Sequence, residues 1–170
     1  MTNKMTNKIT NKKSENMYHY VDSGLDFVYL QNGFEVIEDK YLGKMVAIHN
    51  LDGLNKLIGN YIVEHCPCLR GQELRFLRSE LKMSQTNMAD LVGSDIRTIQ
   101  RWEKDRNNQI DAAADKLIRL TYKSLFDKRH VAAQAIKQYN AARAGVNCRK
   151  IKPPRLRAIE SHDSWKSLAA

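Results

Sequence analysis

The sequence is poor in several features on which whole classes of protein depend. It has only three cysteines in 170 residues, Cys66, Cys68 and Cys148, and an odd, small number of thiols provides no disulfide framework. No apolar run approaches the roughly 20 residues that cross a bilayer, and the first thirty residues lack the apolar segment of a secretory signal. We therefore expect a cytoplasmic protein with free thiols.

Signatures of catalysis and of cofactor binding are also missing. Neither the P-loop pattern nor the glycine pattern of dinucleotide-binding folds occurs, and four histidines have no evident nucleophile or carboxylate partner: His19, His49, His130 and His162. The cluster of His65, Cys66 and Cys68 has one residue between its cysteines, where zinc sites usually have two to four, and a fourth ligand would be distant. We expect no enzyme, no cofactor and no metal site.

Positive charge is abundant and unevenly distributed. Lys and Arg number 28 against 19 Asp and Glu, and the net charge of +9 predicts a polyanionic partner, either nucleic acid or an anionic membrane surface. Residues 1–16 repeat a polar TNK unit and are expected to form a disordered basic tail. Residues 127–170 carry ten basic and three acidic residues and are expected to form a basic helix and tail, which either remains solvated or contacts phosphates.

Residues 17–69 predict a small sheet followed by a helix. Three apolar stretches, FVYL, FEVI and MVAIH, are separated by the hairpin signal Asn32-Gly33 and by a polar turn, which indicates a three-stranded antiparallel sheet. Asn50 or Asp52 is placed to cap a helix whose apolar stripe can cover that sheet: Leu54, Leu57, Ile58, Tyr61 and Ile62. Seven acidic residues against three lysines make this unit a poor DNA-binding surface, so we expect it to serve dimerisation or partner binding.

Residues 70–126 predict a set of short helices. The spacing of apolar residues favours a first helix over about 72–82, a second over 85–92 capped by Ser84, and a longer one over about 112–126. The expected fold class is therefore α+β: a small N-terminal antiparallel sheet plus helix, then an all-α helix-turn-helix domain of about four helices, with basic tails at both ends.

The third helix of this block is expected over residues 95–104. Asp95 caps its start, Gly93 makes the turn before it, and the small Ala89 in the preceding helix permits a close crossing. Ile99 and Trp102 face the core of the domain. On the opposite side, four polar residues fall within one stripe about 100° wide: Arg97, Gln100, Arg101 and Lys104.

The segment SQTNMADLVGSDIRTIQRWEKD resembles the DNA-binding domain of phage Cro and cI repressors and their bacterial relatives, the XRE family. The matching features are the Ser-Gln opening of the second helix, the central Ala, the Gly turn, the capped third helix with a buried Ile, and the terminal Arg-Trp-Glu. After Asp105 one long helix replaces the two shorter helices of many relatives. The resemblance implies a transcriptional regulator, in most such cases a repressor, that binds double-stranded operator DNA.

In such a domain the polar stripe enters the major groove. Arg97 can read guanine, Gln100 can pair with adenine, and Ile96 can pack on a thymine methyl group. The resemblance implies further that Gln85 contacts a phosphate and braces a neighbouring side chain, while Thr98 and Lys104 contact the DNA backbone.

The resemblance also implies that Arg78 and Glu103 form an ion pair that ties the first helix to the end of the third. A single recognition helix reads too few base pairs for useful specificity, so we expect a homodimer on an inverted repeat.

A second function is compatible with the same architecture. A sheet-plus-helix unit followed by a helix-turn-helix is similar to antitoxins of the MqsA kind, which bind a toxin through the N-terminal unit and repress their own operon. The chain lacks the paired CxxC zinc ligands of those proteins. The two hypotheses are therefore a free-standing repressor and the antitoxin of a type II toxin–antitoxin system.

Overall fold

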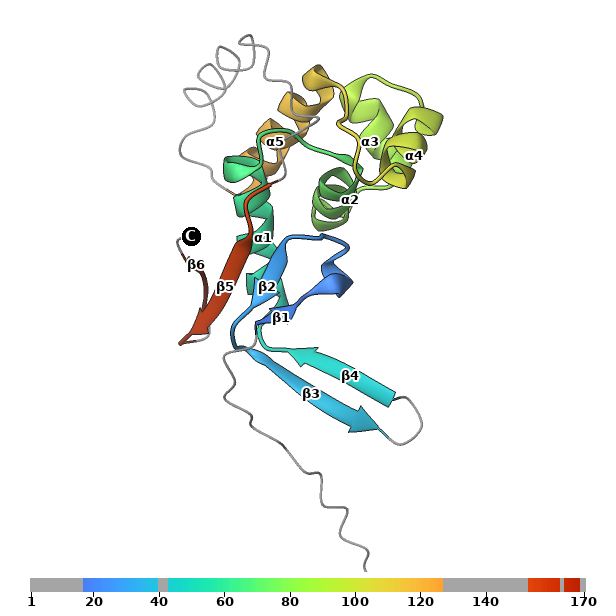
Figure 1. Cartoon of the computed structure of the whole chain (residues 1–170). Coiled ribbons are helices and arrows are strands. Elements are labelled where there is room, and N and C mark those ends of the chain that lie inside the picture. The colour runs from blue at the N-terminus through green and yellow to red at the C-terminus, as the bar shows by residue number, and fades with distance from the viewer. Residues whose placement is uncertain (1–16, 40–42, 127–152, 163, 169–170) are drawn as a thin grey trace, which may run out of the picture.

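The computed structural model describes residues 17–39, 43–126, 153–162 and 164–168 (Figure 1). Its strands are β1 (Tyr18–His19), β2 (Val28–Leu30), β3 (Phe34–Asp39), β4 (Gly43–Ile48), β5 (Leu156–Ser161) and β6 (Ser164–Leu168). Its helices are the short 3-10 helix η1 (Val21–Ser23) and α1 (Leu51–His65), α2 (Gly71–Glu80), α3 (Gln85–Val92), α4 (Ile96–Lys104) and α5 (Ala112–Phe126). An N-terminal sheet followed by helices confirms the α+β class.

Two strands from the C-terminal part of the chain complete the main sheet. Its order is β1-β2-β5-β6, in which β2 and β5 are parallel and the two outer pairs are antiparallel. The register places Val28 beside Leu156 and Leu30 beside Ala158. All four side chains are buried, because alternate residues of a strand share one face of the sheet.

The prediction of a three-stranded sheet within residues 17–69 is wrong. β3 pairs with β4 in a separate two-stranded sheet, whereas β2 pairs with β1 and β5. Both edges of β2 are thereby occupied, so β3 cannot pair with β2. Asn32 and Gly33 connect the two sheets: the Asn32 side chain exchanges hydrogen bonds with the backbone of Glu160 at 2.7 and 3.1 Å, and Gly33 packs against Trp165 in a left-handed conformation, φ 73°.

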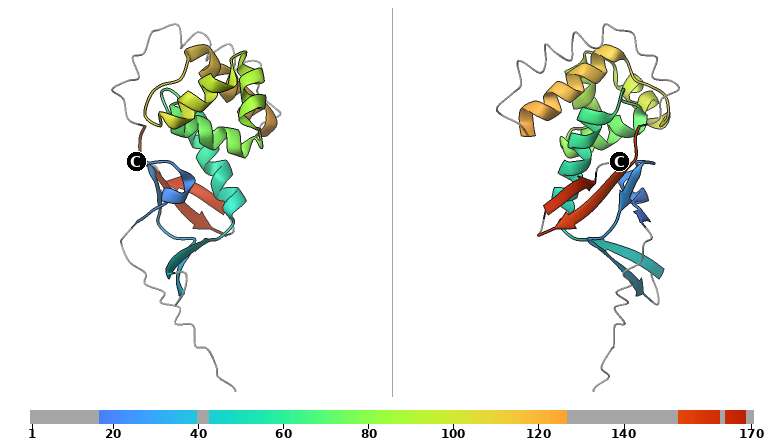
Figure 2. Two further views of the ribbon diagram at one scale, coloured as in Figure 1. Left: turned by 90° about the vertical axis from the view of Figure 1, so that its right-hand side faces the viewer. Right: turned by 60° about the vertical axis from the view of Figure 1, so that its left-hand side comes forward.

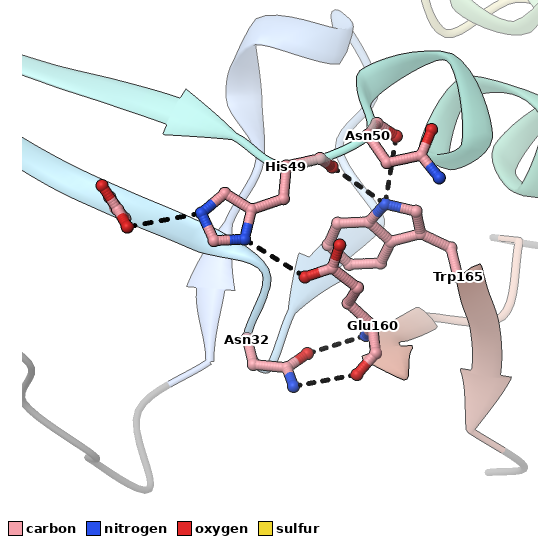
Figure 3. A network of polar contacts seen from close by, with 6 residues as sticks. Asn32, His49, Asn50, Glu160 and Trp165 are labelled. Carbon is pink, nitrogen blue, oxygen red and sulfur yellow. Dashed lines mark hydrogen bonds and ion pairs between the residues drawn. The ribbon is translucent and has the colours of Figure 1, made fainter. Parts of the chain in front are cut away.

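The prediction that residues 127–170 end as a tail is wrong for β5 and β6. Leu156, Ala158 and Trp165 are buried, because both strands place their apolar side chains on the inner face of the sheet. The Trp165 indole N–H donates to the carbonyl oxygens of His49 and Asn50, both at 3.1 Å (Figure 3). The predicted N-terminal tail over residues 1–16 lies outside the described residues, as do residues 127–152, where the predicted basic helix begins.

Helix α1 connects the sheet to the helical block. Asn50 is the cap of this helix, because its side-chain oxygen accepts a hydrogen bond from the Gly53 N–H at 3.0 Å. The helix lies across one face of the four-stranded sheet (Figure 2) and also contacts α2 and α5. Gly59 lets the Tyr122 side chain of α5 pack directly on its backbone. The hydrophobic core is therefore continuous between the sheet and the helices.

A buried arginine of α5 closes the end of α1. Arg119 donates to the carbonyl oxygens of Ile62 and Val63, in the last turn of the helix, at 3.0 and 2.8 Å. Asp115 forms an ion pair with Arg119 and accepts a hydrogen bond from the Leu69 N–H at 2.8 Å. These contacts place α5 against the junction between the sheet unit and the helical block.

The helical block has four helices over residues 71–126, and α5 is a single helix as expected. The Ser84 side chain caps α3 by accepting from the Asn87 N–H at 3.0 Å, and Gly93 ends α3 in the left-handed conformation, φ 67°. None of the helices within the described residues has both the length and the apolar character needed to cross a membrane.

Candidate functional site

Helix α4 presents its polar stripe to solvent. Four side chains of the stripe are exposed: Arg97, Gln100, Arg101 and Lys104. In the part of the chain that the structure describes, none of the three cations forms an ion pair. Ile96, at the start of the helix, is 40% exposed, which is unusual for an isoleucine. The stripe therefore offers hydrogen-bond donors and one apolar contact to a ligand.

The opposite side of α4 is held against the rest of the block. Ile99 is completely buried, Glu103 is 7% exposed, and Trp102 is half-buried. Ala89 of α3 is also buried, and the Ser94 N–H donates to its carbonyl oxygen at 3.0 Å in the turn that leads to α4. A small residue at this crossing allows the two helices to lie close together. The two faces of α4 thus have separate uses, one in packing and one toward solvent.

Asp95 and Thr98 form the cap at the start of α4. The Thr98 N–H donates to one carboxylate oxygen of Asp95 at 2.8 Å, and the Thr98 hydroxyl donates to the other at 3.0 Å. These hydrogen bonds lower the pKa of the Asp95 carboxyl below its usual range. Asp95, Ile96, Arg97, Thr98 and Arg101 line a shallow hollow at this end of the helix.

A network of polar side chains joins α2, α3 and α4. Two nitrogens of Arg78 donate to the Glu103 carboxylate at 2.5 and 3.1 Å, and a third donates to the Met83 carbonyl at 2.8 Å. Gln85 donates to Glu103 at 2.9 Å from the start of α3. The expected ion pair is present, and the side chain that Gln85 braces is Glu103. This network fixes the orientation of α4 relative to the other two helices.

Glycine at position 71 brings the start of α2 against the end of α4. A Cβ on residue 71 would overlap the Trp102 carbonyl oxygen, so only glycine allows this approach. The Gly71 N–H donates to the Asn108 carbonyl at 3.3 Å, and the Gln72 N–H donates to the Arg106 carbonyl at 3.2 Å. The end of α4 is therefore anchored by backbone contacts as well as by Glu103.

Two contacts connect this region to the sheet unit, and the sequence does not reveal them. The Gln72 amide donates to the Asp26 carboxylate at 2.8 Å, and the Arg106 guanidinium donates to the Gly24 carbonyl at 2.8 Å. The partners are 46 and 82 positions apart along the chain, and no local pattern pairs residues at such separations. Gln72 and Arg106 thus hold the loop after η1 beside the end of α4.

The cysteines of the HCPC segment lie inside the protein. Cys66 and Cys68 are both buried with free thiols, and burial raises the pKa of the Cys66 thiol to about 12. Among the described residues, no three His, Cys, Asp or Glu side chains are placed to hold a metal ion. His65 stacks on Tyr61, with 4.5 Å between ring centroids. This segment therefore packs at the end of α1, and Cys148 lies outside the described residues.

No protein-family model, no curated protein and no solved structure matches this chain.

Proposed function

We propose that this protein is a sequence-specific DNA-binding transcriptional regulator, acting in the cytoplasm as a repressor, that reads its operator with α4. The observation that carries this proposal is a helix with two separate uses. Its outer stripe of Arg97, Gln100, Arg101 and Lys104 is exposed and forms no ion pair with any described residue, while Ile99 and Glu103 hold its inner side. A rigidly mounted helix with basic and amide side chains along one exposed face fits the major groove.

The side chains of the stripe differ in what they can recognise. Arg97 and Ile96 lie at the start of α4, which enters deepest into the groove in helix-turn-helix complexes. Arg97 suits the paired acceptors of guanine, Gln100 suits adenine, and the exposed Ile96 suits a thymine methyl group. Arg101 and Lys104 follow along the same stripe, where Lys104 contacts phosphates.

The hydrogen bonds of Thr98 narrow the role that the sequence assigns to it, whereas those of Gln85 are compatible with both of its assigned roles. The Thr98 hydroxyl donates its only proton to Asp95, so it has no proton left for a phosphate oxygen, and its main role is in the cap. The Gln85 amide uses one N–H on Glu103, which leaves its second N–H for a phosphate. Gln85 therefore both braces the network and contacts the DNA backbone.

The proposal is tested by selecting binding sites from a random duplex library and measuring affinity for the selected site and for a scrambled one. Arg97→Ala is expected to reduce the preference for the selected site by about 5- to 150-fold, the equivalent of one good base contact. Lys56→Ala, an equal change of charge on the exposed side of α1, serves as the control and keeps the preference. Failure to enrich any sequence, or an equal loss on both DNAs in Arg97→Ala, would refute the proposal.

A further inference from the structure

The β3–β4 hairpin projects away from the rest of the protein (Figure 1). Its two strands pair with each other from Phe34 opposite Ile48 to Glu38 opposite Lys44, and within the described residues neither pairs with a third strand. A two-stranded sheet is marginally stable in water, and independent stability requires a third strand or a packed face. Among the described residues, only the base of the hairpin meets this requirement, because Phe34 and Ile48 pack against the core.

Beyond that base, the hairpin carries apolar side chains on both of its faces. Val36 lies opposite Val46 on one face, and Ile37 lies opposite Met45 on the other. Val36 is 50% exposed, Ile37 42% and Met45 38%. A ribbon that contacts only water alternates polar and apolar residues, whereas strands with apolar residues on both faces are typical of buried positions. The outer half of the hairpin therefore has the composition of a buried element without a cover.

The charge of the hairpin limits what can cover it. Residues 34–48 contain three acidic residues and two lysines, so the segment is close to neutral and does not attract nucleic acid or an anionic membrane. Glu38 and Lys44 form an ion pair with each other at 3.5 Å, so each neutralises the other beside the apolar residues. A two-fold contact requires a patch that is complementary to itself. Val36 and Val46 form an apolar centre, and the charges of Glu38 and Lys44 on the same face cancel each other, so this face meets that requirement.

We propose that the face of the hairpin that carries Val36 and Val46 is the contact through which a second copy of this chain binds. The two hairpins meet face to face in a symmetric contact, and each covers the Val36 and Val46 side chains of the other. This inference rests on the proposed function for its purpose, because two copies bring two α4 helices to the two halves of an inverted repeat. The contact itself forms without DNA.

The test is the molecular mass of the full chain in the absence of DNA, measured by analytical ultracentrifugation from about 0.1 to 100 μM. Val36→Lys and Val46→Lys are expected each to raise the dimer dissociation constant by about 100-fold, because both place charge in a symmetric apolar contact. Leu117→Lys and Leu125→Lys alter exposed leucines of α5, 38% and 57% exposed, and are expected to change the constant by less than about threefold.

A second measurement does not depend on how the hairpin tolerates lysine. In a Cys148→Ser background, Val36→Cys is expected to give dimers with a short bismaleimide cross-linker, and Leu125→Cys is expected to give none. A wild-type chain that stays monomeric over the whole range, even if its hairpin captures a different protein, overturns the proposal. A dimer that the α5 variants dissociate and the hairpin variants do not overturns it as well.

DNA-binding measurements with the same variants test the proposed function separately from the dimer contact. If the proposed function holds, the monomeric hairpin variants keep the base preference of α4 on a single half-site and lose only the added affinity for the inverted repeat. If the wild-type chain dimerises through the hairpin and selects no DNA sequence, the contact stands and the proposed function fails.

Discussion

Replacing Glu103 by alanine is expected to lower the free energy of unfolding by about 2–4 kcal/mol. The Glu103 side chain is 6% exposed, and its carboxylate accepts two hydrogen bonds from Arg78 and one from Gln85. Removing one partner of a buried ion pair costs about 3–5 kcal/mol, because the other charge stays buried without compensation. The Arg78 side chain is 17% exposed and keeps its bond to the Met83 carbonyl, which moves the expected cost toward the lower part of that range.

The assay is urea unfolding of four proteins: the wild type, Glu103→Ala, Arg78→Met and the double variant. The double variant is expected to lose less than the sum of the two single losses, since it leaves neither charge buried alone. Glu64→Ala, which removes an exposed carboxylate from α1, is the control and is expected to cost less than about 0.5 kcal/mol. The reasoning is refuted if Glu103→Ala unfolds like this control, or if the two single losses simply add.

Three further predictions concern the ends of α4, α1 and the sheet. Asp95→Ala is expected to lower the Tm at pH 7, because it removes the cap of α4. Hydrogen bonds from Thr98 lower the pKa of the Asp95 carboxyl, so the difference in Tm is complete above the ordinary aspartate pKa of about 3.9 and disappears as the pH falls through the lower pKa of the folded state. Thermal unfolding of both proteins at a series of pH values measures this difference. Cys66, whose buried thiol has a pKa of about 12, is expected to resist iodoacetamide at pH 8 in the native protein and to react once urea is added, as peptide mass spectrometry shows. Deletion of residues 153–170 is expected to cost about 5 kcal/mol or more, because it removes the buried side chains of Leu156, Ala158 and Trp165 and exposes β2. A deletion variant with the wild-type Tm would contradict the observed sheet.

The helical block could be predicted closely from the sequence because its signals are local. Ser84, Gly93 and Asp95 each act on the backbone within a few residues of themselves, so their roles as caps and turn can be read without knowing the fold. The two faces of α4 likewise follow from helical periodicity, with Ile99 inside and the polar stripe outside.

The sheet was predicted less well because strand pairing joins residues far apart in the chain. Asn32-Gly33 has the local form of a hairpin turn, yet its neighbours are Glu160 and Trp165, which lie more than a hundred residues later. In the same way, Leu156 and Trp165 belong to a segment whose basic, polar texture is typical of a tail. Nothing in the local pattern of either segment identifies the other.

The sequence by itself therefore determined the helices, the caps of α3 and α4 and the polar stripe of α4, since each depends on interactions within one or two turns of the chain. Only the tertiary structure decided which strands share a sheet, because β2 has two edges and long-range packing selects β1 and β5 for them. It also decided which apolar residues are covered: Val36, Ile37 and Met45 resemble core residues in the sequence, and they stay exposed because the hairpin that carries them extends beyond the core.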